Sequence, residues 1–318
     1  MSETSATADG LADIDVSYVV TAYNKASFVI GMIDSLRRQG DQARAEYIFV
    51  DDASTDGSGE KIAEAARDLP RVTIIRQANA GPAPATNVGV RAARGRYVKL
   101  LDADDLLIGG ITPLLCAELD RVQGDLIKGE LATYRVGEIA PEAATLGTVR
   151  VLDDALYTVI ATGIANTSGT LFRRSAFVAA GGCDETVFVQ DFSFFLRMAR
   201  RGRYLLTDVP VACIPETADG RVSGLHGQTL HDVNRVLLNY VTADPGLSAM
   251  YKCLAMRRAA GRTWKWARRL RGVGLFSKPF LVHLVSRLPI PALAPWVLRN
   301  SCVPFYADTK LRFPGTRL

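Results

Sequence analysis

The chain has 318 residues, of which 48% are hydrophobic and 22% charged, and its formal net charge at pH 7 is +5. This composition predicts a folded protein with one large core or two unequal units, and it excludes a disordered chain. Five scattered cysteines without paired spacing argue against a disulfide framework or a zinc site. Because the first ten residues are polar and do not resemble a signal peptide, we expect a cytoplasmic protein.

The first hundred residues alternate between strand and helix patterns. Apolar runs predict strands at residues 16–21, 47–50, 72–75 and from residue 97 onward. Amphipathic segments predict helices at residues 27–39, 60–68 and 85–93. Strands separated by helices of this length indicate βαβ units, and therefore an α/β fold with a mostly parallel sheet.

Polar side chains follow each of the four predicted strands. They are Tyr23 and Asn24, then Asp51 and Asp52, then Asn79, and finally Asp102, Asp104 and Asp105. In a parallel sheet ligands bind beside the carboxyl ends of the strands, so we expect these groups to share one edge. Three neighbouring carboxylates repel one another unless a cation is present, and Mg²⁺ or Mn²⁺ takes carboxylate oxygens. A divalent cation site is the main interpretation, and a solvated turn that caps the next helix is the alternative.

Two common nucleotide-binding classes are excluded by the absence of their glycine-containing motifs. The turn after the first strand reads TAYNKASF and has no glycine, and no GxxxxGK sequence occurs in the chain. A dinucleotide-binding enzyme needs a glycine-rich turn there, and a P-loop kinase needs the second motif. The acidic group after the fourth strand instead favours a nucleotide that is held through a cation.

Four segments carry a family resemblance. They are VVTAYN, VDDASTDGS, NAGPAPATNVGVRAARGRYVKLLDADD and GGCDETVFVQDFSFFLRMARRG, in this order between residues 15 and 215. Together they resemble the inverting family-two glycosyltransferases with the GT-A fold. The resemblance implies a metal-dependent enzyme that moves a sugar from a nucleotide-diphosphate sugar, with UDP the expected nucleotide, to an acceptor hydroxyl. The implied cofactor is Mg²⁺ or Mn²⁺.

The resemblance also implies site residues. Asp52 accepts a hydrogen bond from the base or ribose, and the donor site further includes Tyr23, Asn24, Asp51, Asn79, Asp102 and Ala103. Asp102 and Asp104 form the metal-binding DxD pair, and Asp191 is the catalytic base. Asp191 also begins a predicted helix, where the helix dipole favours a carboxylate, so a capping role is compatible with catalysis.

Further candidates are less well defined by the motifs. Asn87 either lines the donor site or packs inside its helix, and Arg221 is available to the diphosphate from a loop at residues 218–231. His226 either completes the metal shell, as a late His does in some related enzymes, or is a surface or packing residue. Two positions depart from the family pattern: Gln190 stands where Glu is frequent, and Thr86 stands where many members have Arg.

The C-terminal part is basic and apolar. Residues 257–271 read RRAAGRTWKWARRLR, and residues 274–298 are apolar but contain Lys278, His283, Arg287 and four prolines. These interruptions argue against a transmembrane helix. Basic residues beside Trp264 and Trp266 predict a segment in the membrane interface. A helical tail packed on the domain, or at an oligomer contact, is the alternative.

The predicted organisation has three parts. Residues 1–14 are a flexible N-terminus, residues 15–225 the GT-A glycosyltransferase domain, and residues 226–318 a helical, basic region for membrane, acceptor or oligomer contacts. We expect a protein at the inner face of the cell membrane that acts on a cell-envelope glycan or a lipid-linked intermediate, and no nucleic-acid partner. The alternatives are a transferase acting on a soluble natural product and a catalytically inactive nucleotide-sugar-binding protein.

Overall fold

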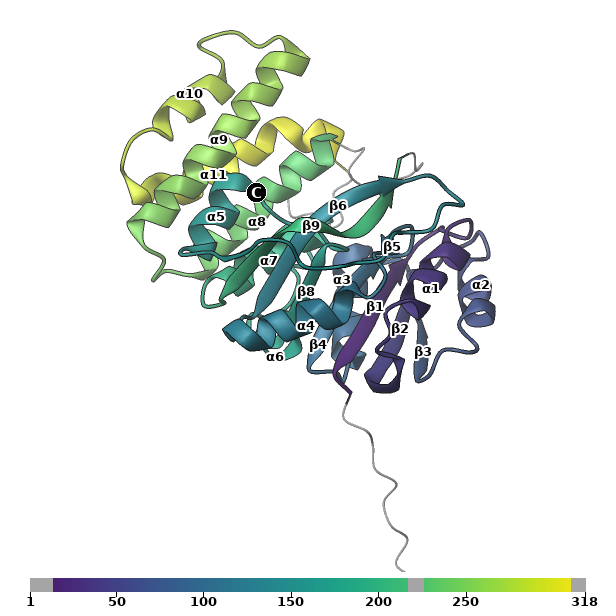
Figure 1. Ribbon diagram of the computed structural model, residues 1–318. Helices are drawn as coiled ribbons and strands as arrows, with labels where there is room; N and C mark the ends of the chain where they lie inside the picture. Colours follow the sequence, from purple (N-terminus) through teal and green to yellow (C-terminus); the bar gives the residue numbers. More distant parts are fainter. Residues whose placement is uncertain (1–13, 217–225, 310–318) are drawn as a thin grey trace, which may run out of the picture.

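The structure is a computed structural model that describes residues 14–216 and 226–309. Within these residues nine strands form one sheet in the order β3-β2-β1-β4-β8-β6-β9-β5, with β7 beside β9 (Figure 1). The strands are β1 (Val16–Ala22), β2 (Ala45–Asp51), β3 (Val72–Arg76), β4 (Tyr97–Asp102), β5 (Leu106–Leu107), β6 (Leu126–Tyr134), β7 (Val149–Val151), β8 (Thr170–Arg173) and β9 (Tyr204–Pro215).

The first four strands form the parallel part of the sheet, as predicted. In the register of this part, Ala22 on β1 lies beside Asp51 on β2, and Thr21 on β1 lies beside Asp102 on β4. The strand ends that carry the predicted polar residues are therefore neighbours. Antiparallel pairing involves β5, β7 or β8, while β6 and β9 are parallel to each other. The predicted α/β fold with a mainly parallel sheet is confirmed.

Helices cover both faces of the sheet (Figure 1). They are α1 (Val29–Arg37), α2 (Ser58–Ala65), α3 (Pro82–Ala92), α4 (Ile111–Val122), α5 (Ala155–Thr162), α6 (Arg174–Ala179), α7 (Gln190–Ala199), α8 (His226–Ala243), α9 (Ala249–Arg271), α10 (Lys278–Val285) and α11 (Ala294–Cys302). Successive residues of β1 enter opposite cores: Tyr18 and Val20 pack with α1, and Val19 packs with α3 and α7. This is the two-residue period of a strand buried on both faces.

The start of α3 differs from the prediction by three residues. The helix begins at Pro82 rather than at residue 85, after Gly81 with φ of +87°. Glycine adopts this φ at little cost, and Pro is favoured in the first turn because its missing N–H has no helical partner there. The turn therefore places the N-terminus of α3 directly beside the end of β2.

The C-terminal helices are packed on the sheet domain. Val241 of α8, Ala259 of α9 and Leu298 of α11 belong to the same buried cluster as Val19 of β1. The expected helical C-terminal region is therefore present, and it shares a core with the preceding domain. The boundary between residues 225 and 226 stays a prediction.

The two tryptophans of α9 do not lie where the sequence suggested. Trp264 and Trp266 are 9% and 8% exposed, and their rings pack against Phe280 at 5.0 Å and Phe305 at 4.6 Å between centroids. The expectation that they reach a membrane interface is wrong, because both hold the C-terminal helices together. Across residues 14–216 and 226–309 no helix is long and apolar enough to cross a membrane.

Candidate active site

A cavity of about 620 Å³ lies at the carboxyl ends of β1, β2 and β4. Its walls come from these strand ends, from the turn before α3, from residues 166–168, and from the starts of α7 and α8. The lining residues include Thr21, Tyr23, Lys25, Asp52, Asn79, Gly81, Asp102, Ala103, Asp104, Asp105, Asn166, Thr167, Ser168, Phe188, Gln190, Asp191, Gln228 and Thr229. Sequence segments that are up to about two hundred residues apart thus enclose one cavity, which contains both apolar wall and the polar side chains predicted for the site.

Most predicted site residues reach this cavity. Those that line it are Tyr23, Asp52, Asn79, Asp102, Ala103, Asp104 and Asp191. Asn24 follows β1 and Asp51 ends β2, and both bond to the loop after β2: Asn24 Oδ1 accepts from Thr55 N–H, and Asp51 Oδ1 accepts from Ser54 N–H. Arg221 lies outside the described residues. His226 begins α8, but its side chain is not described.

The carboxylates after β4 are held close together. Asp104 and Asp105 are 5% and 3% exposed, and Asp102 is half-buried beside them. Burial holds the pKa of Asp102 well above its usual range, and the negative charges of Asp105, Asp104 and Asp191 raise it further. Lys25 opposes this effect, since its Nζ lies 2.8 Å from Asp104 Oδ2. Any additional positive charge would therefore stabilise the ionised form of these carboxylates.

These carboxylates fit a hard divalent cation that arrives with a diphosphate. Mg²⁺ is usually held by one or two carboxylates and by substrate phosphates rather than by a complete protein cage. Among the residues the structure describes, no group of three or more His, Cys, Asp or Glu side chains is arranged to hold a metal. Asp102 and Asp104 are the two carboxylates that could share a cation with a diphosphate in this way.

Asp52 fixes the turn before α3. One oxygen of its carboxylate accepts from Gln77 Nε2 at 2.7 Å and Ala80 N–H at 2.8 Å, and the other accepts from Gly81 N–H at 2.6 Å. Asn79 Nδ2 donates to the main-chain oxygen of Asp52 at 3.1 Å. A carboxylate has about four acceptor positions, so one remains for a ligand. Asp52 thus shapes this wall and keeps a single acceptor for the cavity.

Asp191 lies in the first turn of α7. Its Oδ1 accepts from the N–H of Phe192 at 2.7 Å, and burial raises its pKa. A carboxylate whose pKa is raised toward neutrality suits proton transfer as a general base. Next to it, Gln190 Nε2 donates to Thr167 Oγ1 at 3.1 Å. The side-chain amide of Gln190, at the position where the motif resemblance leads us to expect Glu, is therefore bonded to the cavity wall.

Asn87 does not line this cavity. Its Nδ2 donates to Cys183 O at 3.1 Å and to Glu185 Oε1 at 2.8 Å, and its Oδ1 accepts from Cys183 N–H at 2.8 Å. These bonds tie α3 to the segment that leads into α7. The donor-lining interpretation of Asn87 is therefore replaced by the packing interpretation.

The residues not singled out from the sequence include Lys25 and Ser168, which line the cavity, and Lys99, which bonds to Ser168. Lys25 pairs with Asp104, and Ser168 Oγ accepts from Asp102 N–H at 3.0 Å. Lys99 is fully buried in β4 and donates to the main-chain oxygens of Ser168 and Thr170. A lysine inside the apolar run YVKLL was the one available signal, because a buried charge requires specific partners.

The buried Lys99 makes the stability of the protein depend on pH. Burial lowers its pKa to about 7 from the ordinary 10.5, although Asp105 and Asp102 oppose the shift. Between these values the unfolded chain binds the proton and the folded chain does not, so stability rises with pH across this window.

We therefore expect the urea-derived free energy of unfolding to rise from pH 7 to pH 9.5, and to rise less steeply in Lys99→Met. Lys61→Met, at an exposed position, is the matched control and keeps the wild-type slope. An unchanged slope in Lys99→Met would show that another group carries the effect.

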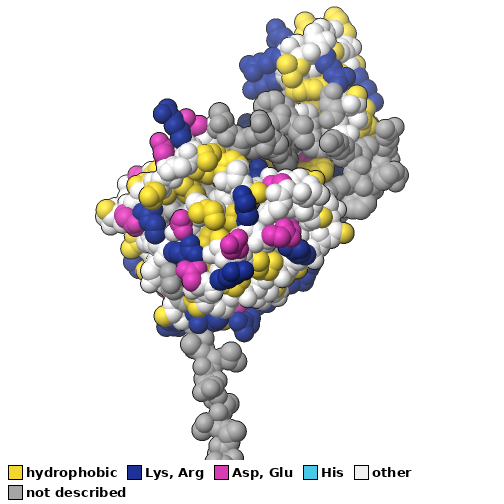
Figure 2. Space-filling model, turned by 90° about the vertical axis from the view of Figure 1, so that its right-hand side faces the viewer, with side chains coloured by type: hydrophobic (Ala, Val, Ile, Leu, Met, Phe, Trp, Pro, Cys, Tyr) yellow, Lys and Arg dark blue, Asp and Glu magenta, His cyan; other side chains and the backbone are white. Residues whose placement is uncertain are grey.

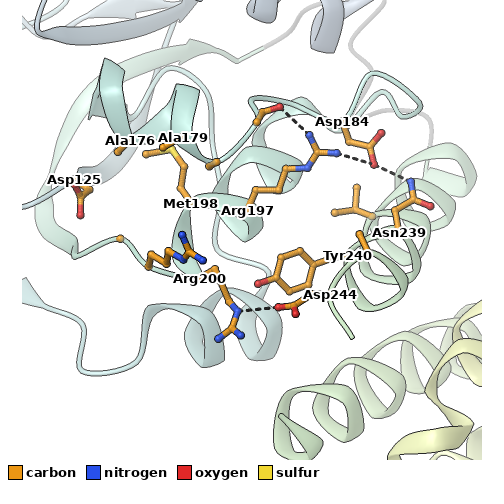
Figure 3. Close-up of a pocket in the computed structure, with 16 residues that line it drawn as sticks. Asp125, Ala176, Ala179, Asp184, Arg197, Met198, Arg200, Asn239, Tyr240 and Asp244 are labelled. Carbon is orange, nitrogen blue, oxygen red and sulfur yellow. Dashed lines mark hydrogen bonds and ion pairs between the residues drawn. The ribbon is translucent and has the colours of Figure 1, made fainter. Parts of the chain in front are cut away.

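A second cavity of about 870 Å³ lies at the far ends of α7 and α8 (Figure 3). Arg197 faces Asp184 there at 3.6 Å, and Arg200 Nε lies 2.9 Å from Asp244 Oδ2. Because carboxylates already offset these two guanidinium groups, the cavity is a weaker candidate for a diphosphate than the one at the strand ends. It nevertheless gives a defined alternative location for a ligand.

Comparison with known proteins decides the family. Residues 17–177 match the family described as glycosyl transferase family 2. The chain belongs to this family. It is 38% identical over 112 residues to the uncharacterized glycosyltransferase EpsJ of Bacillus subtilis, covering 35% of this chain and 32% of EpsJ. It is 42% identical over 92 residues to the succinoglycan biosynthesis protein ExoO of Rhizobium meliloti, covering 29% and 26%. The match spans about a third or less of these two curated relatives.

Solved structures share the fold at low sequence identity. TarS 1–349 of S. aureus superposes with a TM-score of 0.64 and 18% identity over 92% of this chain and 89% of that chain. The mannosyltransferase PcManGT of Pyrobaculum calidifontis gives a TM-score of 0.56 and 18% identity over 94% and 88%. These similarities extend through the C-terminal helices, and they support the GT-A fold expected from the sequence motifs.

Proposed function

We propose that this family 2 chain is a metal-dependent, inverting glycosyltransferase. It moves a sugar from a nucleotide-diphosphate sugar, with UDP the foremost nucleotide, to an acceptor hydroxyl. One observation carries the proposal: Asp102 and Asp104 line the same cavity as Asp191. A cation-binding pair and a carboxylate of raised pKa are the two groups that glycosyl transfer from a diphosphate requires.

The donor side of the cavity would hold the diphosphate and the nucleoside. Asp102 and Asp104 would bind the divalent cation, which when bound stabilises the departing diphosphate as a Lewis acid. Lys25 adds a protein cation within the same cavity. The remaining acceptor position of Asp52 and the half-exposed ring of Tyr23 suit the hydrogen bonding and stacking of a nucleoside.

The choice of UDP rests on related structures. TarS 1–349 has been solved with UDP-GlcNAc and with UDP, whereas PcManGT has been solved with GDP-Man and Mn²⁺. The two TarS complexes, together with the motif resemblance, support UDP for this chain, and GDP, as bound to PcManGT, is the second choice. The presence of Mn²⁺ with PcManGT supports a divalent cation in the fold.

Asp191 would act on the acceptor side. The acceptor oxygen attacks the anomeric carbon while the bond between the anomeric carbon and the diphosphate oxygen breaks. The Asp191 carboxylate takes the proton of the acceptor hydroxyl. Attack opposite the leaving group inverts the anomeric configuration. Because ExoO is named for the biosynthesis of a polysaccharide, succinoglycan, a cell-envelope glycan or a lipid-linked intermediate is the proposed acceptor class.

A donor panel tests this function. Radiolabelled UDP-GlcNAc, UDP-glucose, UDP-galactose and GDP-mannose are incubated with the protein and with Mn²⁺ or Mg²⁺, and release or transfer of the sugar is measured. We expect one UDP-sugar to be turned over in preference to the others. A protein that binds a donor in calorimetry but neither hydrolyses nor transfers the sugar would instead be a nucleotide-sugar-binding protein.

A further inference from the structure

The last three α-helices, α9 to α11, carry charged side chains of one sign only. Residues 249–307 contain eleven of the 38 Lys and Arg residues and none of the 33 Asp and Glu residues of the chain. Exposed cations stand on both sides of the corner between α9 and α10: Arg268, Arg269 and Arg271 precede it, and Lys278 and Arg287 follow it. Figure 2 shows dark blue and yellow side chains together on the part of the molecule that projects upward.

The same corner exposes large apolar side chains. Leu270 is 68%, Leu275 63% and Phe276 87% exposed. They continue into a stripe on α10 and the turn after it, where Leu281, Leu284 and Leu288 are 49%, 48% and 46% exposed. These three recur at helical spacing and so share one face. We call Leu270, Leu275, Phe276, Leu281, Leu284 and Leu288 the apolar edge.

The backbone at Phe276 adds an independent observation. Its φ is +73°, in the left-handed region that a bulky side chain rarely occupies. The turn therefore carries a backbone cost and also leaves the largest side chain of the edge in water. Both costs are unexplained in the isolated chain, and a partner that buries Phe276 would offset them.

The apolar edge stands on a rigid support. Trp264 of α9 packs against Phe280 of α10, and Trp266 packs against Phe305. These buried rings fix α10 on α9 and anchor α9 to the short helical segment Val303–Asp308. The apolar side chains are therefore presented by a folded helical corner and not by a flexible tail.

We infer that the apolar edge and its flanking cations form a docking surface for an anionic lipid bilayer. Phe276 and the leucines enter the interface between headgroups and acyl chains, and the arginines and lysine contact the anionic headgroups. A second copy of this chain is a poorer partner, because two faces of the same positive charge repel each other. A nucleic acid would neutralise the cations but would leave the apolar edge in water. The inference does not depend on the proposed enzymatic function.

Co-sedimentation of the full-length protein with vesicles tests the inference. Vesicles of phosphatidylcholine alone are compared with vesicles containing phosphatidylglycerol, at low and high salt. We expect binding to the anionic vesicles that high salt weakens but does not abolish, because the apolar edge still partitions. The double variant Leu275→Ser/Phe276→Ser should bind anionic vesicles about tenfold more weakly. The variant Arg268→Gln/Arg269→Gln/Lys278→Gln should lose about a hundredfold on the anionic vesicles.

Matched variants distinguish binding through the apolar edge from binding through exposed apolar side chains in general. Ile139→Ser removes a side chain that is 79% exposed on another part of the molecule, and it should bind like the wild type. Leu281→Ser/Leu284→Ser is a second pair on the edge, with circular dichroism as the check on folding. Wild-type protein that stays in the supernatant at low salt would overturn the inference. So would vesicle binding that is unchanged in both edge pairs, or a dimer in solution that Leu275→Ser/Phe276→Ser dissociates.

Discussion

Asp191→Asn is expected to lower turnover by about 10²-fold or more while donor affinity stays within about twofold. The amide keeps the shape of the side chain and can still accept the bond from Phe192 N–H, but it cannot take a proton from the acceptor. Single-turnover transfer of the radiolabelled sugar gives the rate, and calorimetric titration of the donor gives the affinity. Glu64→Gln makes the same chemical change at an exposed position of α2 and should leave both quantities unchanged.

The pH profile adds a readout that a structural role of Asp191 would not produce. Because burial raises the pKa of Asp191, activity should fall as the pH drops through that raised value and the base becomes protonated. The residual activity of Asp191→Asn should lack this acidic limb. Loss of donor binding together with turnover would assign Asp191 to donor binding or to folding.

Chelation is expected to abolish transfer, and Mn²⁺ or Mg²⁺ to restore it. Asp104→Ala should remain at least about 10²-fold below the wild type at every metal concentration, because one of the two carboxylate donors is absent. The measurement is a metal titration of transfer after dialysis against EDTA, with Glu64→Gln as the control variant. Full activity of the wild type in excess chelator would remove the divalent cation from the mechanism.

Lys25 is a cation that the protein itself provides to these carboxylates. In the structure its ammonium group pairs with Asp104, where a bound cation would compete with it. Lys25 thereby offsets part of the negative charge of the carboxylates. Burial is the main cause that raises the pKa of Asp102, its acidic neighbours raise it further, and Lys25 lowers it.

The parallel half of the fold was predictable because its signals are local. Buried apolar runs alternate with amphipathic helices, and the polar residues at the strand ends follow from the direction of the strands. The mixed half was not predictable in the same way. β5 has two residues and β7 three, so their pairing with β9 depends on contacts between distant segments and not on a periodic pattern.

Individual side chains were harder to place than strands. Asn87 lies on a helix beside the site, and only the packing of that helix against residues 183–185 decides which way it points. Trp264 and Trp266 looked like a membrane anchor by composition. Two residues apart on a helix, they point in different directions, and in the structure each packs against its own aromatic partner. The Lys25–Asp104 pair joins residues that are 79 positions apart, and nothing in the sequence around either residue predicts this contact.

The location of the donor site is tested most directly by the position of Mn²⁺ in crystals grown with UDP and Mn²⁺, located by anomalous diffraction. We expect the metal peak between the carboxylates of Asp102 or Asp104 and the diphosphate, with the uracil beside Asp52 and Tyr23. A nucleotide bound instead in the cavity lined by Arg197 and Arg200, or a metal peak remote from Asp102 and Asp104, would contradict the proposal that the cavity at the strand ends is the donor site.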